Sequence, residues 1–136
     1  MQTKIDTELR KNGYSATLPR RLVFTALEQA GTLSMQQIEK ATSSQIDRAS
    51  VYRTMRLFEE LGFIRRISQG WKYTFELSDL FRHHHHHLVC RICETVVELQ
   101  DTPGLEESIG LLINSYGFTG IKHEIEISGV CPRCAH

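Results

Sequence analysis

The chain has 136 residues, enough for one domain or two small ones, and its 40% hydrophobic content is typical of a globular protein. Its apolar runs are too short to cross a membrane as helices. The polar first 20 residues lack the apolar segment of a signal peptide, so we expect a cytoplasmic protein. The net charge is zero, yet residues 1–72 carry 12 Lys and Arg against 7 Asp and Glu, and residues 73–136 carry 4 against 9. The basic first half could bind a polyanion, and the acidic, His-rich second half could bind a metal ion. The charge distribution therefore predicts two functions in one chain.

The first half of the chain has the hydrophobic spacing of four helices. Thr17 stands where a capping residue would start the second helix. Ser34 and Gln37 form a capping box for the third, on which Ala41 is expected to face inward. Asp47 is a cap for the fourth. The helices are expected over residues 5–11, 17–30, 34–41 and 47–61.

The helix expected over residues 47–61 has two different faces. Val51, Met55 and Phe58 recur at helical spacing and should be buried. The opposite face carries small, aromatic and arginine side chains, which suit a helix that reads DNA. Arginine donates hydrogen bonds to guanine or to phosphate, and a tyrosine hydroxyl can contact either a phosphate or a base. The residues on this face are Ala49, Tyr52, Arg53, Arg56 and Glu60.

Two segments with strand character follow, residues 63–67 and 71–77, with an expected turn at residues 68–70. The hairpin is basic through Arg65, Arg66 and Lys72. Helices followed by a basic hairpin predict a winged helix-turn-helix that binds double-stranded DNA. A helical bundle with a charged, solvated surface is the alternative interpretation.

The second half has the pattern of a small α/β unit. Short strands are expected at residues 88–90 and 95–99, an amphipathic helix over residues 103–116, and a strand over residues 121–127, where apolar and polar residues alternate. A unit of this size has little core of its own. We therefore expect a bound metal and a second copy of the chain to stabilise it.

Two Cys-x-x-Cys pairs contain every cysteine of the chain: Cys90, Cys93, Cys131 and Cys134. Two such pairs provide the four thiolates of a closed tetrahedral Zn²⁺ site. Disulfides or redox chemistry are the alternative, which the absence of a signal peptide makes less favourable.

Five consecutive histidines, His83 to His87, directly precede the first cysteine pair. Imidazoles suit a metal that exchanges, rather than one that is buried permanently. On a strand, alternate side chains share a face, so the odd-numbered and even-numbered histidines should point in opposite directions. A solvated polar loop is the alternative.

The order of these motifs resembles the ferric uptake regulator family of bacterial metal-dependent transcription factors. The resemblance covers nearly the whole chain, and the histidine tract with its two distant Cys-x-x-Cys pairs is its most specific part. The matching stretches are residues 18–20, 49–55, 75–77 and 84–93, together with Glu98, His123 and the final Cys-x-x-Cys.

The resemblance implies three metal sites. The structural zinc ligands would be Cys90, Cys93, Cys131 and Cys134. A sensing site that accepts Fe²⁺, Mn²⁺ or Zn²⁺ would use Glu76, His85, His87 and Glu98. An additional site would use His84, His86, Glu106 and His123, with Glu107 as the alternative to Glu106.

Residues and resemblance together predict an α+β protein in three parts: a winged-helix DNA-binding domain (1–77), a hinge (78–82) and a small α/β metal-binding dimerisation domain with the four-cysteine zinc site (83–136). We expect a homodimeric repressor of genes for metal uptake or homeostasis that binds a pseudo-palindromic operator, without a small-molecule substrate. Tyr52, Arg53, Ala49 and Arg56 would contact DNA from the helix, and Arg20, Arg66 and Lys72 would contact phosphates.

Three positions depart from the family pattern. Thr32 lies in a loop where many members place a histidine that links the DNA-binding domain to the sensing metal. Asp79 lies in a segment about two residues longer than the family pattern and is an unassigned candidate ligand. Glu94 replaces a common glycine after the first cysteine pair, so the turn there could differ.

Other classes of function share some of these residues. A zinc hydrolase would activate water at an open metal position, but the sequence has no His-Glu-x-x-His motif, and we expect no enzyme activity. A metal-storage or chaperone module would need only the histidine tract, and the basic helix argues against it. A peroxide sensor, in which bound Fe²⁺ promotes oxidation of a ligand histidine, stays open within the family.

Overall fold

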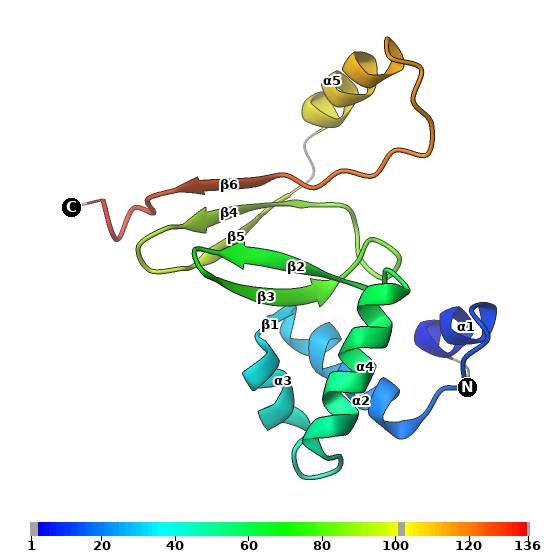
Figure 1. Ribbon diagram of the computed structural model, residues 1–136. Helices are drawn as coiled ribbons and strands as arrows, with labels where there is room; N and C mark the ends of the chain where they lie inside the picture. Colours follow the sequence, from blue (N-terminus) through cyan, green and yellow to red (C-terminus); the bar gives the residue numbers. More distant parts are fainter. Residues whose placement is uncertain (1–2, 101–102, 136) are drawn as a thin grey trace. The chain divides into compact units, whose positions relative to one another are not determined.

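The computed structural model describes residues 3–100 and 103–135, with helices and strands in the order drawn in Figure 1. The chain divides into two compact units, Met1–His83 and His84–His136. The helices are α1 (Lys4–Lys11), α2 (Leu18–Ala30), α3 (Met35–Thr42), α4 (Arg48–Glu60) and α5 (Pro103–Asn114). The strands are β1 (Thr32–Leu33), β2 (Ile64–Gln69), β3 (Lys72–Leu77), β4 (His86–Cys90), β5 (Val96–Leu99) and β6 (Glu126–Gly129). Within the described residues, none of the helices is long and apolar enough to cross a membrane.

The helix starts of the first unit follow local sequence signals. The predicted capping box of α3 is present, with Ser34 and Gln37 each bonded to the other's backbone N–H. Asp47 caps α4 by accepting from the N–H of Ser50 at 3.0 Å. Thr17 precedes α2 as predicted, but its side chain makes no capping hydrogen bond. Pro19 occupies the first turn there and has no N–H to donate.

Helix α3 runs one residue further than predicted and buries a different side chain. Thr42 is buried, and its hydroxyl donates to the carbonyl of Ile38 at 2.9 Å. Ala41, predicted to face inward, is exposed. The prediction was wrong because it followed side-chain polarity, whereas a threonine can satisfy its hydroxyl inside its own helix.

The core of the first unit lies between its helices and the sheet. Val51, Met55 and Phe58 are buried, as predicted for the inner face of α4. They belong to one cluster with Phe63 and Phe75, which follow α4 in the chain. This core fixes the buried side of α4 and leaves its opposite side exposed.

The sheet of the first unit has the order β1-β3-β2, and all its pairings are antiparallel. The β2–β3 hairpin is the predicted wing, but its turn is Gly70-Trp71 because Gln69 pairs with Lys72. The turn predicted at residues 68–70 was therefore misplaced. Strand β1 was not predicted, since two residues are too few to show a period.

The segment expected to be a hinge packs on the first unit. The N–H of Ser78 donates to the carbonyl of Phe63 at 2.8 Å. The ring of Phe81 contacts those of Phe24 and Phe63, with centroids 4.9 and 5.4 Å apart. The first part of the connection is therefore anchored by aromatic contacts.

In the second unit, β4 lies between an antiparallel β5 and a parallel β6. The strand predicted over residues 121–127 is wrong in its bounds, because β6 begins only at Glu126. Glu126 pairs with His87, and the carbonyl of Ile125 still accepts from the N–H of His87 at 3.1 Å. Residues before Ile125 would need β4 to extend upstream of its first residue, His86. Alternation alone predicted a strand where no partner backbone continues.

Helix α5 ends at Asn114, so Tyr116 lies beyond it, and Gly117 adopts a φ of +72°. No residue of α5 is buried within the unit. Its apolar side chains and those just after it are exposed: Leu105, Leu111, Leu112, Tyr116 and Phe118. The second unit therefore presents a large apolar surface.

Candidate metal centres and DNA-binding surface

The four cysteines of the two Cys-x-x-Cys pairs come together in the second unit, with ligand atoms that all lie within 4.8 Å of one another. The sulfurs of Cys93 and Cys131 are 3.7 Å apart. Two sulfurs bound to one tetrahedral Zn²⁺ at about 2.3 Å lie about 3.8 Å apart, whereas disulfide sulfurs are about 2.05 Å apart. All four thiols are free. The donor set therefore fits zinc, and the disulfide alternative does not describe this structure.

The surroundings of these sulfurs stabilise the thiolate form of some cysteines but not of all four at once. Backbone N–H groups, those of Cys93 and Cys131 among them, lower the pKa of Cys90 to about 6. The hydroxyl of Thr95 lowers the pKa of Cys93. The hydrogen bond to Cys131 and burial raise the pKa of Cys134 to about 12. A divalent cation removes this conflict, because it compensates the charge of all four sulfurs at once.

The turn after the first cysteine pair has the geometry of a glycine turn although no glycine is present. Glu94 has a φ of +63° and is, among the described residues, the one non-glycine with a positive φ. Its N–H donates to the carbonyl of Cys90 at 2.9 Å. The turn therefore adopts a left-handed conformation that favours glycine, and Glu94 carries the steric cost of it.

The histidine tract presents its side chains alternately, as the strand prediction requires. The ring centroids of His84 and His86 are 4.7 Å apart, and those of His85 and His87 are 4.8 Å apart. The two pairs belong to two different clusters because successive side chains of a strand point to opposite faces.

The first cluster unites His84 and His86 with His123 and Glu106, and its ligand atoms lie within 4.8 Å of one another. The Nε2 atoms of His84 and His123 are 3.1 Å apart. Glu106 lies 2.6 Å from Nε2 of His86 and 2.8 Å from Nε2 of His123. The neighbouring Glu107 is exposed. Three imidazoles and a carboxylate form a donor set that fits Zn²⁺ or another borderline divalent ion.

Hydrogen bonding fixes the proton in this cluster. Nδ1 of His86 accepts from the N–H of Ile125 at 3.3 Å, so the neutral ring carries its proton on Nε2 and donates it to Glu106. Burial alone would raise the pKa of Glu106. The hydrogen bond from His86 and the charges of His123 and His84 outweigh burial, and the pKa lies below its ordinary value. A metal at Nε2 of His86 must displace that proton, so binding there is coupled to pH.

Three residues of the predicted sensing site lie in the second unit. Glu98 on β5 is paired directly with His87 on β4. Its Oε1 lies 3.9 Å from Nε2 of His85. His87 on β4, His85 just before β4 and Glu98 on β5 are therefore brought together.

Glu76, the fourth predicted sensing residue, lies in the first unit and is fully buried. Its carboxylate accepts from Nε of Arg65 at 2.7 Å and from Nη1 of Arg82 at 3.0 Å. Asp79 also pairs with Arg65, at 3.2 Å, and Thr32 lies opposite Glu76 in the β1–β3 pairing. Metal coordination by Glu76 or Asp79 stays a prediction, and in either case the ion has to compete with guanidinium groups.

The exposed face of α4 carries the side chains predicted to contact DNA. Tyr52 is 41% exposed, and Ala49, Arg53 and Arg56 are exposed as well. The guanidinium of Arg53 donates to the hydroxyl of Ser50 at 3.1 Å. The N-terminal half of α4 therefore presents an aromatic ring and a positive charge side by side.

Arg20 lies close to this face. It lines one surface groove with Arg53, between the start of α2 and the middle of α4. Its Nη1 donates to the carbonyl of Ser15 at 2.6 Å, and its guanidinium lies 5.4 Å from the ring of Tyr14. The structure thus brings Arg20 and Arg53 together at the edge of the predicted DNA-binding surface.

The remaining predicted DNA contacts already have partners. Arg56 pairs with Glu60 at 3.4 Å, and Arg66 forms two hydrogen bonds with Glu59, at 2.9 and 3.0 Å. Lys72 lies 4.8 Å from the ring centroid of Trp71, next to the turn of the wing. Arg56 on α4 and Arg66 on β2 are therefore more strongly neutralised than Arg53.

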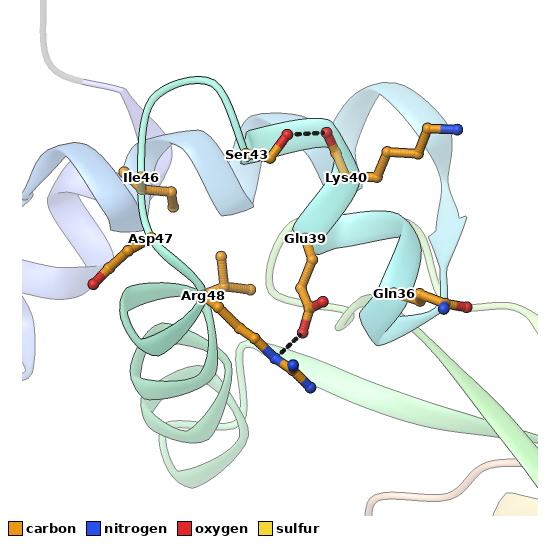
Figure 2. Close-up of a pocket in the computed structure, with 8 residues that line it drawn as sticks. Gln36, Glu39, Lys40, Ser43, Ile46, Asp47 and Arg48 are labelled. Atoms are coloured by element: carbon orange, nitrogen blue, oxygen red, sulfur yellow. Dashed lines mark hydrogen bonds and ion pairs between the residues drawn. The ribbon is translucent and has the colours of Figure 1, made fainter.

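The structure also places a residue on this surface that the sequence analysis did not single out. Arg48, the first residue of α4, points across a shallow groove toward Glu39 of α3 (Figure 2), with Nε 3.1 Å from Oε1. It also donates to the hydroxyl of Tyr52, at 3.4 Å. Its position four residues before Tyr52, on the same helix face, was the available sequence signal.

Comparison with known proteins agrees with this arrangement. The model of the ferric uptake regulator family matches residues 11–128. The ferric uptake regulation protein of Legionella pneumophila is 34% identical over 133 residues, which cover 93% of this chain and 96% of that protein. The crystal structure of the Vibrio cholerae ferric uptake regulator has a TM-score of 0.72 at 30% identity, covering 93% and 98% of the two chains. The structure of the ferric uptake regulator from Pseudomonas aeruginosa with manganese has a TM-score of 0.80 at 27% identity, covering 94% of this chain and 98% of that one. The chain therefore belongs to the ferric uptake regulator family.

Proposed function

We propose that this member of the family, a metal-responsive DNA-binding transcriptional regulator, acts as a homodimeric repressor. Bound metal would let the dimer hold a pseudo-palindromic operator and so control genes for metal uptake or homeostasis. The observation that carries the proposal is the combination, in one chain, of a winged helix with an exposed Tyr52-Arg53 face and a unit with two converging sets of metal donors.

Zinc bound by the four cysteines would be a structural ion that stabilises the folded second unit. The 3.7 Å separation of the sulfurs of Cys93 and Cys131 supports this role, since it is close to the spacing in a tetrahedral zinc site. The four-sulfur set leaves no open position, so zinc there contributes folding free energy and no catalysis.

A second divalent ion would be the signal. We assign it to Glu76, His85, His87 and Glu98, with Fe²⁺, Mn²⁺ and Zn²⁺ as the chemically suitable ions. His84, His86, Glu106 and His123 would hold an additional ion. The ion acts as an effector only through a higher affinity for the DNA-competent arrangement than for the other.

Dimerisation would use the apolar surface of the second unit. Leu111, Leu112 and Phe118 are 68%, 64% and 71% exposed, and large apolar side chains left exposed close together in the chain indicate an association site. A two-fold dimer presents two copies of α4, which matches the symmetry of a pseudo-palindromic operator. It also doubles the basic surface that faces phosphates.

DNA would be contacted by Tyr52, Arg53 and Ala49, near the N-terminal half of α4. Residues there reach base edges in helix-turn-helix proteins. Arg20 and Lys72 would contact phosphates. Arg56 and Arg66 would do so only in competition with Glu60 and Glu59.

The test is operator binding by the full, zinc-loaded chain in the presence of Mn²⁺, with an operator selected from random duplexes. We expect Tyr52→Ala to weaken binding at least tenfold, and Tyr52→Phe, the matched control, to show how much depends on the hydroxyl. Zinc content and sedimentation should stay unchanged in both variants. A folded, zinc-loaded wild type that selects no duplex would reject the regulator and leave metal storage as the better account.

A further inference from the structure

We propose that Arg48 is a base-reading residue of this regulator, and that Glu39 holds its guanidinium so that it reads sequence rather than adding general affinity for phosphates. The inference rests on the proposed function and adds a specificity determinant to it. It starts from the contact between α3 and α4 in Figure 2.

The position of Arg48 is that of a reading residue. It is the first residue of α4, and the N-terminal residues of a recognition helix contact base edges in the major groove. Its side chain is 75% exposed. It lies four residues before Tyr52, so the two side chains share one face of the helix.

Two contacts hold the guanidinium in place. Nη2 donates to the hydroxyl of Tyr52 at 3.4 Å, and the guanidinium carbon lies 5.4 Å from the centroid of that ring. On the other side, Nε lies 3.1 Å from Oε1 of Glu39, a residue of α3 that is 23% exposed. An arginine ordered in advance loses less side-chain entropy on binding than a free one.

The same contacts indicate that the Arg48–Glu39 pair does more than stabilise the packing of α3 against α4. An ion pair with one partner 75% exposed contributes little to folding stability. The contact of Nε with Glu39 leaves both Nη nitrogens with donors to offer, and a guanidinium fork of this kind fits O6 and N7 of guanine. Because α3 is the helix that crosses the DNA backbone in this motif, the carboxylate of Glu39 also repels nearby phosphates.

The experiment is a selection from random duplexes with the full, zinc-loaded chain in Mn²⁺, comparing wild type with Arg48→Ala, Arg48→Lys and Glu39→Gln. Arg48→Ala should lose discrimination at one base pair of each half-site by about 5- to 100-fold and leave the other positions unchanged. Arg48→Lys should lose the same discrimination while it retains binding to random DNA. Lysine keeps the charge but lacks the planar fork.

Glu39→Gln has the opposite expected effect. Binding to random DNA should become tighter and more dependent on salt: the slope of log affinity against log salt concentration should steepen by about one for each bound chain. The ratio of the affinity for the operator to the affinity for random DNA should fall. Unchanged melting temperature and sedimentation would show that all three variants fold and dimerise.

Two results would overturn the inference while leaving the regulator intact. One is a wild type that selects a clear operator together with an Arg48→Ala variant that selects the same operator with equal discrimination. The other is an equal loss of affinity for every sequence in Arg48→Ala, which would make Arg48 a phosphate contact. A wild type without any selected sequence would reject the proposed function and this inference together.

Discussion

At the scale of single residues, charge pairing decides which groups are available for function. Glu76 is buried between the guanidinium groups of Arg65 and Arg82, and Arg66 is tied to Glu59. A buried carboxylate needs such partners, because desolvation without them is costly. Motif matching predicts the type of each residue, but the partners that compete for it depend on the fold.

Cysteine reactivity gives the first prediction at this scale. After zinc is removed by a chelator under reducing conditions, Cys93 should be alkylated by iodoacetamide before Cys134. Cys93 is exposed and has a lowered pKa, while the pKa of Cys134 is raised to about 12. Peptide mass spectrometry follows each site, and the zinc-loaded protein, in which all four should be protected, is the control. Faster labelling of Cys134 would contradict the description of the site.

Glu94 gives the second prediction. Its φ of +63° costs a residue with a side chain about 1–2 kcal/mol, and a β-branched residue more. Glu94→Val should therefore lower the free energy of unfolding by about 2 kcal/mol or more relative to Glu94→Gly. Denaturant titrations of the two zinc-loaded variants measure the difference. Equal stability would mean that the turn does not require the left-handed conformation.

At the scale of elements, the signals that succeeded were local ones. The capping residues Ser34 and Asp47, and the buried stripe of α4, predicted two helix starts and the inner face of the longer helix. Alternation along the histidine tract predicted its two faces. Each of these follows from neighbours within a few residues, whose interactions depend little on the rest of the fold.

The elements that failed depend on partners distant in sequence. Strand β1 exists because Thr32 and Leu33 pair with β3, and the residues before Ile125 have no β4 residue opposite them because β4 starts at His86. Sequence patterns contain no information on where a partner strand begins. For the same reason the sequence named the candidate ligands, whereas the contacts of Glu76 and Arg48 needed the structure.

The wing can be tested with its own fluorophore. Trp71, the only tryptophan of the chain, is 85% exposed at the turn of the hairpin. If Lys72 contacts a phosphate, operator binding should change the environment of the adjacent Trp71 and shift or quench its emission. Lys72→Ala should reduce the salt slope of binding by about one for each bound chain. Emission that stays constant at saturating operator would place the wing away from DNA.

At the scale of the whole molecule, the two units differ in what stabilises them. In the first, the core combines side chains from four helices and the sheet. In the second, Val89 and Cys90 are the buried apolar residues among those described. A unit with so small a core depends on bound metal and on association.

Metal removal should therefore affect the units unequally. Chelation of zinc should leave the first unit folded and make the second unit open locally much more often, so that limited proteolysis yields a resistant fragment ending near His83. Readdition of Zn²⁺ before the protease should protect the full chain. Equal digestion of both units after chelation would show that the first unit is not stable alone.

Anaerobic fluorescence anisotropy can decide whether metal controls DNA binding through His85 and His87, as we claim. The zinc-loaded chain would be titrated onto its selected operator with Fe²⁺, Mn²⁺, Zn²⁺ or EDTA. We predict that at least one ion tightens binding tenfold or more, that His85→Ala/His87→Ala abolishes this effect with zinc content unchanged, and that His83→Ala, which alters a tract residue outside the predicted sites, preserves it. Operator affinity that is the same with every ion and with EDTA would contradict the claim and make the protein a constitutive DNA-binding protein.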